Sequence, residues 1–129
     1  AGPRAPSQEA ISLSHLEDML SVLTREQVGF LVTLYLQAST SHLEALARSH
    51  DAGDIAGVSA QAHILISLAG NVGASDASEA ARALERACRD DAPKDQIAGL
   101  VCGLAEKVGA SRLALQSWQS ALEELRASA

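Results

Sequence analysis

One histidine and one glutamate have the spacing in this sequence that points most clearly to chemistry. His63 lies ten residues before Gly73, and Glu85 lies eleven residues after Ala74. If the two segments form an antiparallel helical hairpin, both side chains lie about 15 Å from its turn. The carboxylate can then accept a hydrogen bond from one ring nitrogen, which fixes the tautomer and leaves the lone pair of the other nitrogen free as a nucleophile.

Glu85 also has a simpler interpretation. Arg89 follows it by four residues, so the two side chains can form an ordinary ion pair on the surface of one helix. The spacing of these residues leaves both interpretations open.

The segment that carries His63 is predicted to turn this side chain outward. At about 100° per residue, His63 lies roughly 130° from the centre of an apolar seam. The seam consists of Ile55, Val58, Ala62, Leu65, Ala69 and Val72. The helical neighbours of His63 are Ala56, Ser59, Ala60, Ile66, Ser67 and Gly70. An imidazole on such a smooth, uncharged surface suggests close approach by another protein, but the pattern also fits an idle histidine on a weakly amphipathic helix.

Helical periodicity after about residue 12 predicts the elements that position these side chains. Thr24 precedes Gln27 by three residues, which is the spacing of a capping box, and Asp54 is suited to cap the next helix. Asp76 and Glu79 repeat the capping-box spacing at the start of the fourth helix. The five expected helices cover about 13–23, 24–50, 55–72, 75–89 and 93–126.

Connections of about two to five residues force sequential helices to lie antiparallel. We therefore predict an all-α protein, an antiparallel up-down four-helix bundle with a short extra N-terminal helix. Residues 12–126 are assigned to the bundle, 1–11 to a linker or cloning remnant, and 127–129 to a C-terminal tail. Three interior glycines, each costing about 1 kcal/mol relative to Ala, are expected to leave the last helix dependent on packing and prone to bend or fray.

Composition excludes several classes of function. Ten basic and 16 acidic residues give a net charge of -6 without a basic cluster, which argues against nucleic acid as a partner. Cys88 and Cys102 have no metal-ligand spacing, and no apolar run reaches the roughly 18 residues of a membrane span. Without a nucleotide-cradling glycine loop, the chain is expected to have no autonomous kinase activity. We also expect no bound metal and no direct membrane contact.

Residues 62–74 read A-H-I-L-I-S-L-A-G-N-V-G-A, which resembles the signature of histidine-containing phosphotransfer domains, A-H-x-L-K-G-x-A-G-x-x-G-A. The similarity extends over most of the chain, roughly 16–118. By this resemblance, His63 is the phosphoacceptor, which takes a phosphoryl group from a receiver-domain aspartate and passes it to another receiver. Glu85 then orients the imidazole. The expected partner-binding residues are Ser59, Ala60, Ile66, Ser67 and Gly70.

The resemblance also implies partners and a location. The partners are receiver domains of a hybrid histidine kinase, a response regulator or both, with Mg²⁺ held by the receiver and no cofactor bound by this domain. We expect a cytoplasmic location, either as a freestanding protein or as the C-terminal domain of a membrane-anchored hybrid sensor kinase.

Two residues depart from the family pattern. Ile66 and Ser67 stand where the family has Lys and Gly. Because that Lys offsets negative charge beside the phosphohistidine, its loss is expected to slow transfer, and Arg82 and Arg86 are the candidates to compensate. The alternatives are therefore a degenerate module that binds a receiver without efficient transfer, or an unrelated helical adaptor.

Overall fold

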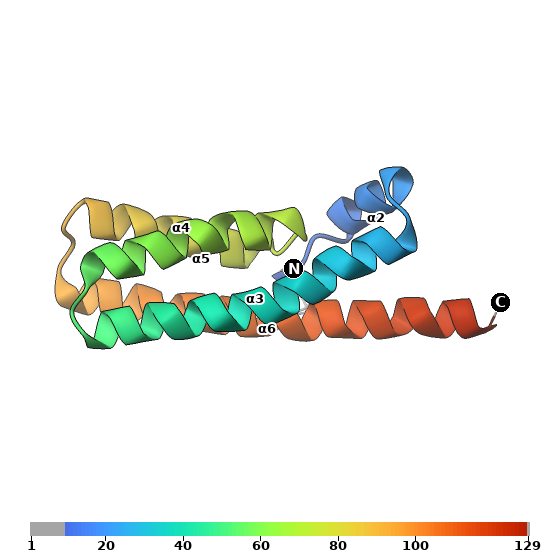
Figure 1. Cartoon of the computed structure of the whole chain (residues 1–129). Helices are drawn as coiled ribbons and strands as arrows, with labels where there is room; N and C mark the ends of the chain where they lie inside the picture. The colour runs from blue at the N-terminus through green and yellow to red at the C-terminus, as the bar shows by residue number, and fades with distance from the viewer. Residues whose placement is uncertain (1–9, 129) are drawn as a thin grey trace, which may run out of the picture.

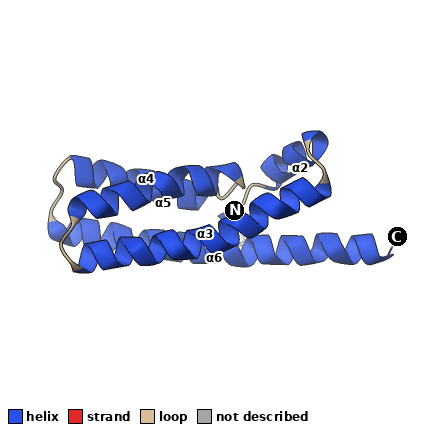
Figure 2. Cartoon of the chain, viewed as in Figure 1, coloured by secondary structure: helices blue, strands red, loops and turns tan. Residues whose placement is uncertain are grey.

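The computed structural model describes residues 10–128, and within that range regular structure is entirely helical (Figure 2). Helices α3 to α6 form an antiparallel bundle in which α4 packs against α3 and α5, and α6 packs against α5 and α3 (Figure 1). The predicted fold class is therefore confirmed. The helices are α2 (Leu13–Val22), α3 (Arg25–Asp51), α4 (Ile55–Asn71), α5 (Ser75–Arg89) and α6 (Lys94–Ser128).

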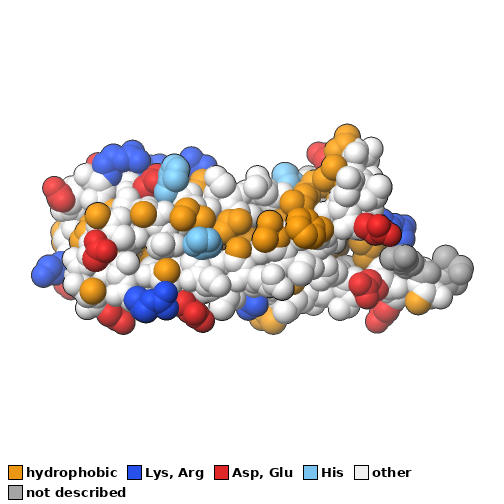
Figure 3. Space-filling view, in the orientation of Figure 1, with side chains coloured by type: hydrophobic (Ala, Val, Ile, Leu, Met, Phe, Trp, Pro, Cys, Tyr) orange, Lys and Arg blue, Asp and Glu red, His pale blue; other side chains and the backbone are white. Residues whose placement is uncertain are grey.

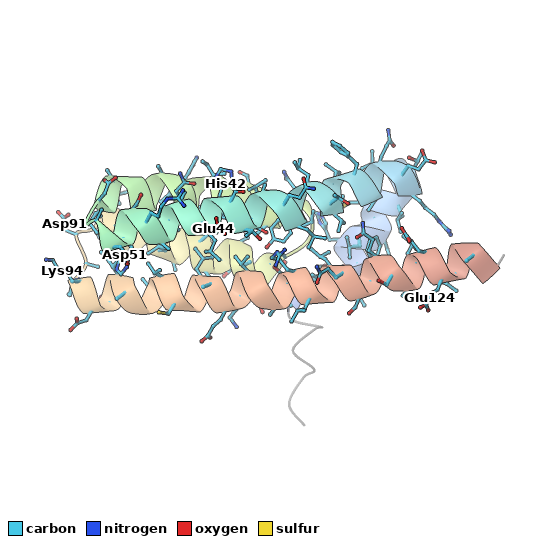
Figure 4. The ribbon with its side chains drawn as sticks, turned by 60° about the horizontal axis from the view of Figure 1, so that its bottom comes forward. His42, Glu44, Asp51, Asp91, Lys94 and Glu124 are labelled. Carbon is cyan, nitrogen blue, oxygen red and sulfur yellow. The ribbon has the colours of Figure 1, made fainter. Side chains whose placement is uncertain are left out.

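The four bundle helices differ in length, which gives the molecule two unlike ends. The α3–α4 and α5–α6 connections lie at one end, where Figure 4 labels Asp51, Asp91 and Lys94. At the other end α4 and α5 stop, while the first part of α3 and the last part of α6 continue beside α2 (Figure 1). The α4–α5 hairpin therefore turns in the middle of the molecule.

Side-chain caps set the starts of α3 and α4 where the sequence predicts them. The Gln27 amide donates to Thr24 Oγ1 at 3.1 Å, and the Thr24 amide donates to Gln27 Oε1 at 2.9 Å. The Gly57 amide donates to Asp54 Oδ1 at 3.0 Å. Each cap satisfies backbone donors that the first helical turn leaves unpaired. The predicted capping box and the predicted Asp54 cap are both confirmed.

The predicted carboxylate cap at the start of α5 is wrong. This helix begins directly after Ala74, which makes no side-chain cap bond. Gly73 reverses the chain with a φ of +77°, a conformation that favours glycine. The Ser12 amide donates to the Gly73 carbonyl at 2.7 Å, and His15 Nε2 lies 3.1 Å from the last carbonyl of α4. Contacts from the N-terminal segment thus hold the turn that a local cap was expected to hold.

The core is a column of aliphatic side chains along the bundle axis. Leu46, Leu65, Leu84 and Leu104, one from each bundle helix, have no exposed surface. Many of the other buried residues are alanines, which let α4 and α5 approach each other closely. Because α4 and α5 pack so closely, the side chains of His63 and Glu85 lie toward the outside of the hairpin.

The ends of the packed region differ from the predicted domain boundaries. Ala10 and Ile11 are buried in the core, so the bundle begins before residue 12. The rest of the expected linker, residues 1–9, lies outside the described residues. Helix α6 continues through residues 127 and 128 of the expected tail, and Ala129 lies outside the described residues.

Helix α6 is one continuous helix of 35 residues despite its three interior glycines. A Cβ atom placed on Gly99 or Gly103 would meet no heavy atom within 4 Å. We therefore expect Gly99→Ala and Gly103→Ala each to raise the free energy of unfolding by about 0.5–1 kcal/mol, because Ala restricts the unfolded chain. Urea denaturation followed by circular dichroism measures this change.

Gly73→Ala provides the control for that prediction. It forces a side chain into a positive φ and brings a Cβ within 3.2 Å of His15 Cβ, so it should destabilise the protein. A loss of stability in the two α6 variants would contradict the expectation that glycine weakens this helix.

Candidate functional site

Helix α4 turns one imidazole away from the core. The seam residues Val58, Ala62, Leu65 and Ala69 are buried, and α4 packs against both α3 and α5. The His63 side chain is 73% exposed. The predicted outward orientation of His63 is therefore confirmed.

Glu85 on α5 reaches this imidazole. Its Oε2 atom lies 2.6 Å from His63 Nδ1, and the Glu85 side chain is only 16% exposed. A carboxylate in this position only accepts hydrogen bonds, so the proton of the pair belongs on Nδ1. In the neutral ring, Nε2 then carries the lone pair, on a side chain that is mostly exposed. This is the contact that the spacing of the two residues predicted.

The second oxygen of Glu85 binds a different partner. Arg89 Nη2 donates to Glu85 Oε1 at 3.2 Å within α5. Both interpretations that the spacing left open are therefore correct. Glu85 contacts His63 through Oε2 and Arg89 through Oε1. Exposed ion pairs of this kind contribute at most about 1 kcal/mol to the free energy of unfolding. The folded bundle therefore positions His63, Glu85 and Arg89, which we call the Glu85 cluster, and the cluster contributes little to the stability of the bundle.

A partly buried hydrogen bond links α4 and α5 near His63 and Glu85 and helps to set the register of the hairpin. Ser78 Oγ donates to the Ile66 carbonyl at 2.9 Å. Ser78 and Glu85 are two helical turns apart, so they lie on the same side of α5, the side that faces α4. This bond and the Ala-rich packing fix the height at which Glu85 meets His63.

The arginines of α5 occupy different positions around Glu85. Arg82 and Arg89 are exposed and lie three residues before and four residues after it, within about 60° of Glu85 around the helix axis. Arg86 lies on the side opposite the buried face of α5. Arg82 and Ile66 are each about 4.5 Å nearer the hairpin turn than Glu85 and His63, so they stand at the same level. Figure 3 shows Lys and Arg side chains along the upper left edge of the molecule, where Figure 1 places the α4–α5 hairpin.

The predicted partner-binding residues are only partly on the surface. Ala60, Ser67 and Gly70 are exposed around His63. Ser59 and Ile66 are partly buried, and Ile66 packs against the core. The open part of this face is therefore small and uncharged.

Sequence reasoning missed an apolar surface next to this face. Ile64 and Leu34 are 38% and 44% exposed. They belong to the neighbouring helices α4 and α3, which the 2.7 Å contact between His42 Nδ1 and Gln61 Oε1 also joins. Figure 3 shows hydrophobic side chains gathered in a band along this part of the surface. The position of Ile64 directly after His63 is the signal that could have found it.

The surroundings of the site offer little other chemistry. Burial, with a further contribution from the negative charge of Glu85, raises the pKa of the Cys88 thiol, which keeps it protonated and unreactive. Among residues 10–128, no cluster of three or more His, Cys, Asp or Glu side chains could hold a metal ion. Within these residues, none of the helices combines the length and the apolar character that a membrane span requires.

Comparison with known proteins gives one match. The family model of the Hpt domain matches residues 31–128, which include most of α3 and all of α4, α5 and α6. Searches of curated proteins and of solved structures returned no match. Because the family match covers the whole hairpin that carries His63 and most of the chain, the chain belongs to the Hpt domain family and has a phosphotransfer role in two-component phosphorelays.

Proposed function

We propose that this chain is a phosphorelay intermediate that accepts a phosphoryl group on His63 from one receiver domain and passes it to another. The observation that carries this proposal is the 2.6 Å contact between Nδ1 of His63 and Oε2 of Glu85. It leaves Nε2 as the unprotonated, exposed nitrogen. A bond forms between Nε2 and phosphorus while the bond from phosphorus to the receiver's aspartate oxygen breaks, and the reverse step delivers the group onward.

The division of labour between the two domains follows from the chemistry of phosphoryl transfer. Such transfer depends on alignment and on neutralising negative charge, with little covalent chemistry for the protein to perform. His63 and Glu85 supply the aligned nucleophile. Mg²⁺ held by the receiver supplies most of the positive charge, and this domain binds no cofactor of its own.

The receiver docks, in this proposal, on the face of α4 around His63. The small exposed residues Ala60, Ser67 and Gly70 let the partner backbone come close to the ring. Beside them, Ile64 and Leu34 offer apolar contact area. The receivers belong to a hybrid histidine kinase, a response regulator or both, and the domain acts in the cytoplasm, freestanding or as part of such a kinase.

A bulky charge in the middle of this face tests the docking surface. We expect Ser67→Arg to weaken receiver binding by at least about 10-fold. The new side chain fills the space beside His63, and docking of the receiver would remove water from its charge. Isothermal titration calorimetry with a cognate receiver measures the dissociation constant. Ser117→Arg, at an exposed position of α6, is the matched control. Unchanged affinity in Ser67→Arg would place the receiver elsewhere.

Arg82 is the cation best placed to take over from the missing family lysine. It stands level with Ile66 and, at 100° per residue, lies about 40° closer than Arg86 to Glu85 around the axis of α5. We expect Arg82→Ala to slow transfer by about 10-fold through lost charge stabilisation, and Arg86→Ala to leave the rate nearly unchanged. Rapid-quench measurement with a phosphorylated receiver gives both rates. Equal effects of the two substitutions would remove Arg82 from this role.

Incubation with a panel of phosphorylated receiver domains tests the proposed function itself. We expect acid-labile phosphate to appear on the chain with at least one receiver and to move on to a second. Binding without transfer from any receiver would favour the degenerate module. Neither binding nor transfer would favour a helical adaptor that uses an exposed apolar face.

A further inference from the structure

We propose that Arg89 is a positioning residue for phosphoryl transfer, which acts by holding Glu85 in the orientation that binds His63. This inference rests on the proposed function of His63. It starts from the division of the Glu85 carboxylate, in which Oε2 meets His63 Nδ1 at 2.6 Å and Oε1 accepts from Arg89 at 3.2 Å. The i, i+4 spacing predicts the ion pair of Arg89 with Glu85, but it assigns Arg89 no part in the chemistry of His63.

The geometry explains why a second bond matters. A glutamate side chain rotates about three bonds, so a single hydrogen bond to an exposed ring leaves its carboxylate many competing orientations. Arg89 lies one helical turn after Glu85 in α5, farther from the α4–α5 connection, and donates its hydrogen bond from that direction. With Oε1 held there, Oε2 is the oxygen that faces His63.

The tautomer of His63 depends on this orientation. When Oε2 accepts from Nδ1, the proton stays on Nδ1 and Nε2 keeps its lone pair. When the carboxylate turns away, Nε2 can carry the proton, and a protonated Nε2 cannot attack phosphorus. Arg89 therefore acts on the nucleophile through Glu85, without touching the ring.

Arg89 also offsets charge where α4 supplies none. The neighbours of His63 along α4 are uncharged, so Glu85 contributes a negative charge next to the site of an incoming phosphoryl group. The guanidinium at 3.2 Å compensates for that carboxylate. Arg82 stands on the opposite, turn-proximal side of Glu85, so the two arginines have separate tasks.

The test compares Arg89→Ala with Arg89→Lys and uses Arg86→Ala as the matched control. Two readouts are needed: the rate of transfer from a phosphorylated receiver, and the His63 tautomer from nitrogen NMR of the ring at a pH where it is neutral. We expect Arg89→Ala to slow transfer by up to about 5-fold and to raise the population protonated on Nε2. Arg89→Lys, which can still pair with Glu85 across one turn, should restore both readouts, and Arg86→Ala should change neither.

The two readouts separate this inference from the proposed function. An unchanged tautomer and an unchanged rate in Arg89→Ala would overturn the role of Arg89 while leaving His63 as the phosphoacceptor. If the wild-type chain accepts no phosphoryl group, the proposed function fails, and the tautomer alone still shows whether Arg89 orients Glu85. A slower rate that tracks a loss of helix content, without a tautomer change, would indicate a structural role and contradict the proposal.

Discussion

Replacing His63 by Gln is expected to abolish phosphoryl transfer and leave the bundle folded. The glutamine side chain has similar length and polarity but no basic nitrogen, since the lone pair of an amide is delocalised. The histidine side chain is 73% exposed and contributes little to the core, so helix content should not change. The measurement is acid-labile phosphate on the chain after incubation with a phosphorylated receiver.

His42→Gln is the matched control for this variant. His42 lies on α3, is labelled in Figure 4, and contacts Gln61 rather than the Glu85 cluster. We expect it to retain transfer, and we expect His63→Gln to retain receiver binding. Acid-labile phosphate on the His63→Gln chain would show that another residue is the phosphoacceptor.

Removing the Glu85 carboxylate is expected to slow phosphoryl transfer without unfolding the bundle. Glu85→Ala should slow transfer by up to about 100-fold, because the ring loses the partner that sets its tautomer and its direction. Glu85→Gln should recover part of that loss, since its amide oxygen still accepts a hydrogen bond from Nδ1. Single-turnover kinetics with a saturating phosphorylated receiver separates this effect on transfer from an effect on binding.

The stability of the Glu85 variants distinguishes a role in transfer from a role in folding. The ion pairs of this cluster lie at the surface, so the free energy of unfolding should change by no more than about 1 kcal/mol. Glu79→Ala, at an exposed position earlier in α5, is the control and should transfer normally. A Glu85→Ala variant with wild-type kinetics would remove Glu85 from the mechanism.

The helices and the central contact could be predicted because they depend on local sequence and on helical geometry. The caps of α3 and α4 are local, since each side chain accepts from the backbone amide three residues later: Thr24 from Gln27, and Asp54 from Gly57. The meeting of His63 and Glu85 follows from equal distances to one tight turn. The start of α5 could not be predicted in this way, because contacts from Ser12 and its neighbours hold the turn across the fold.

Other parts of the site depend on packing that spacing does not determine. The levels of Arg82 and Arg86 relative to Ile66 depend on the register of the α4–α5 hairpin, to which the Ser78 hydrogen bond contributes. The exposure of Leu34 beside α4 depends on how α3 and α4 pack. Sequence spacing also presented the two partners of Glu85 as alternatives, whereas the carboxylate binds both.

The atom that carries the phosphoryl group distinguishes phosphorylation of His63 at Nε2 from every other site on the chain. After phosphorylation by a receiver domain, phosphorus–proton NMR at alkaline pH reports which ring nitrogen is modified. Because Glu85 engages Nδ1 of His63, we predict phosphorus on Nε2, with couplings to both carbon-bound ring protons. A coupling to the Hε1 proton alone would place the group on Nδ1, and a signal from any other residue would exclude His63 as the phosphoacceptor; either result would refute transfer through Nε2 of His63.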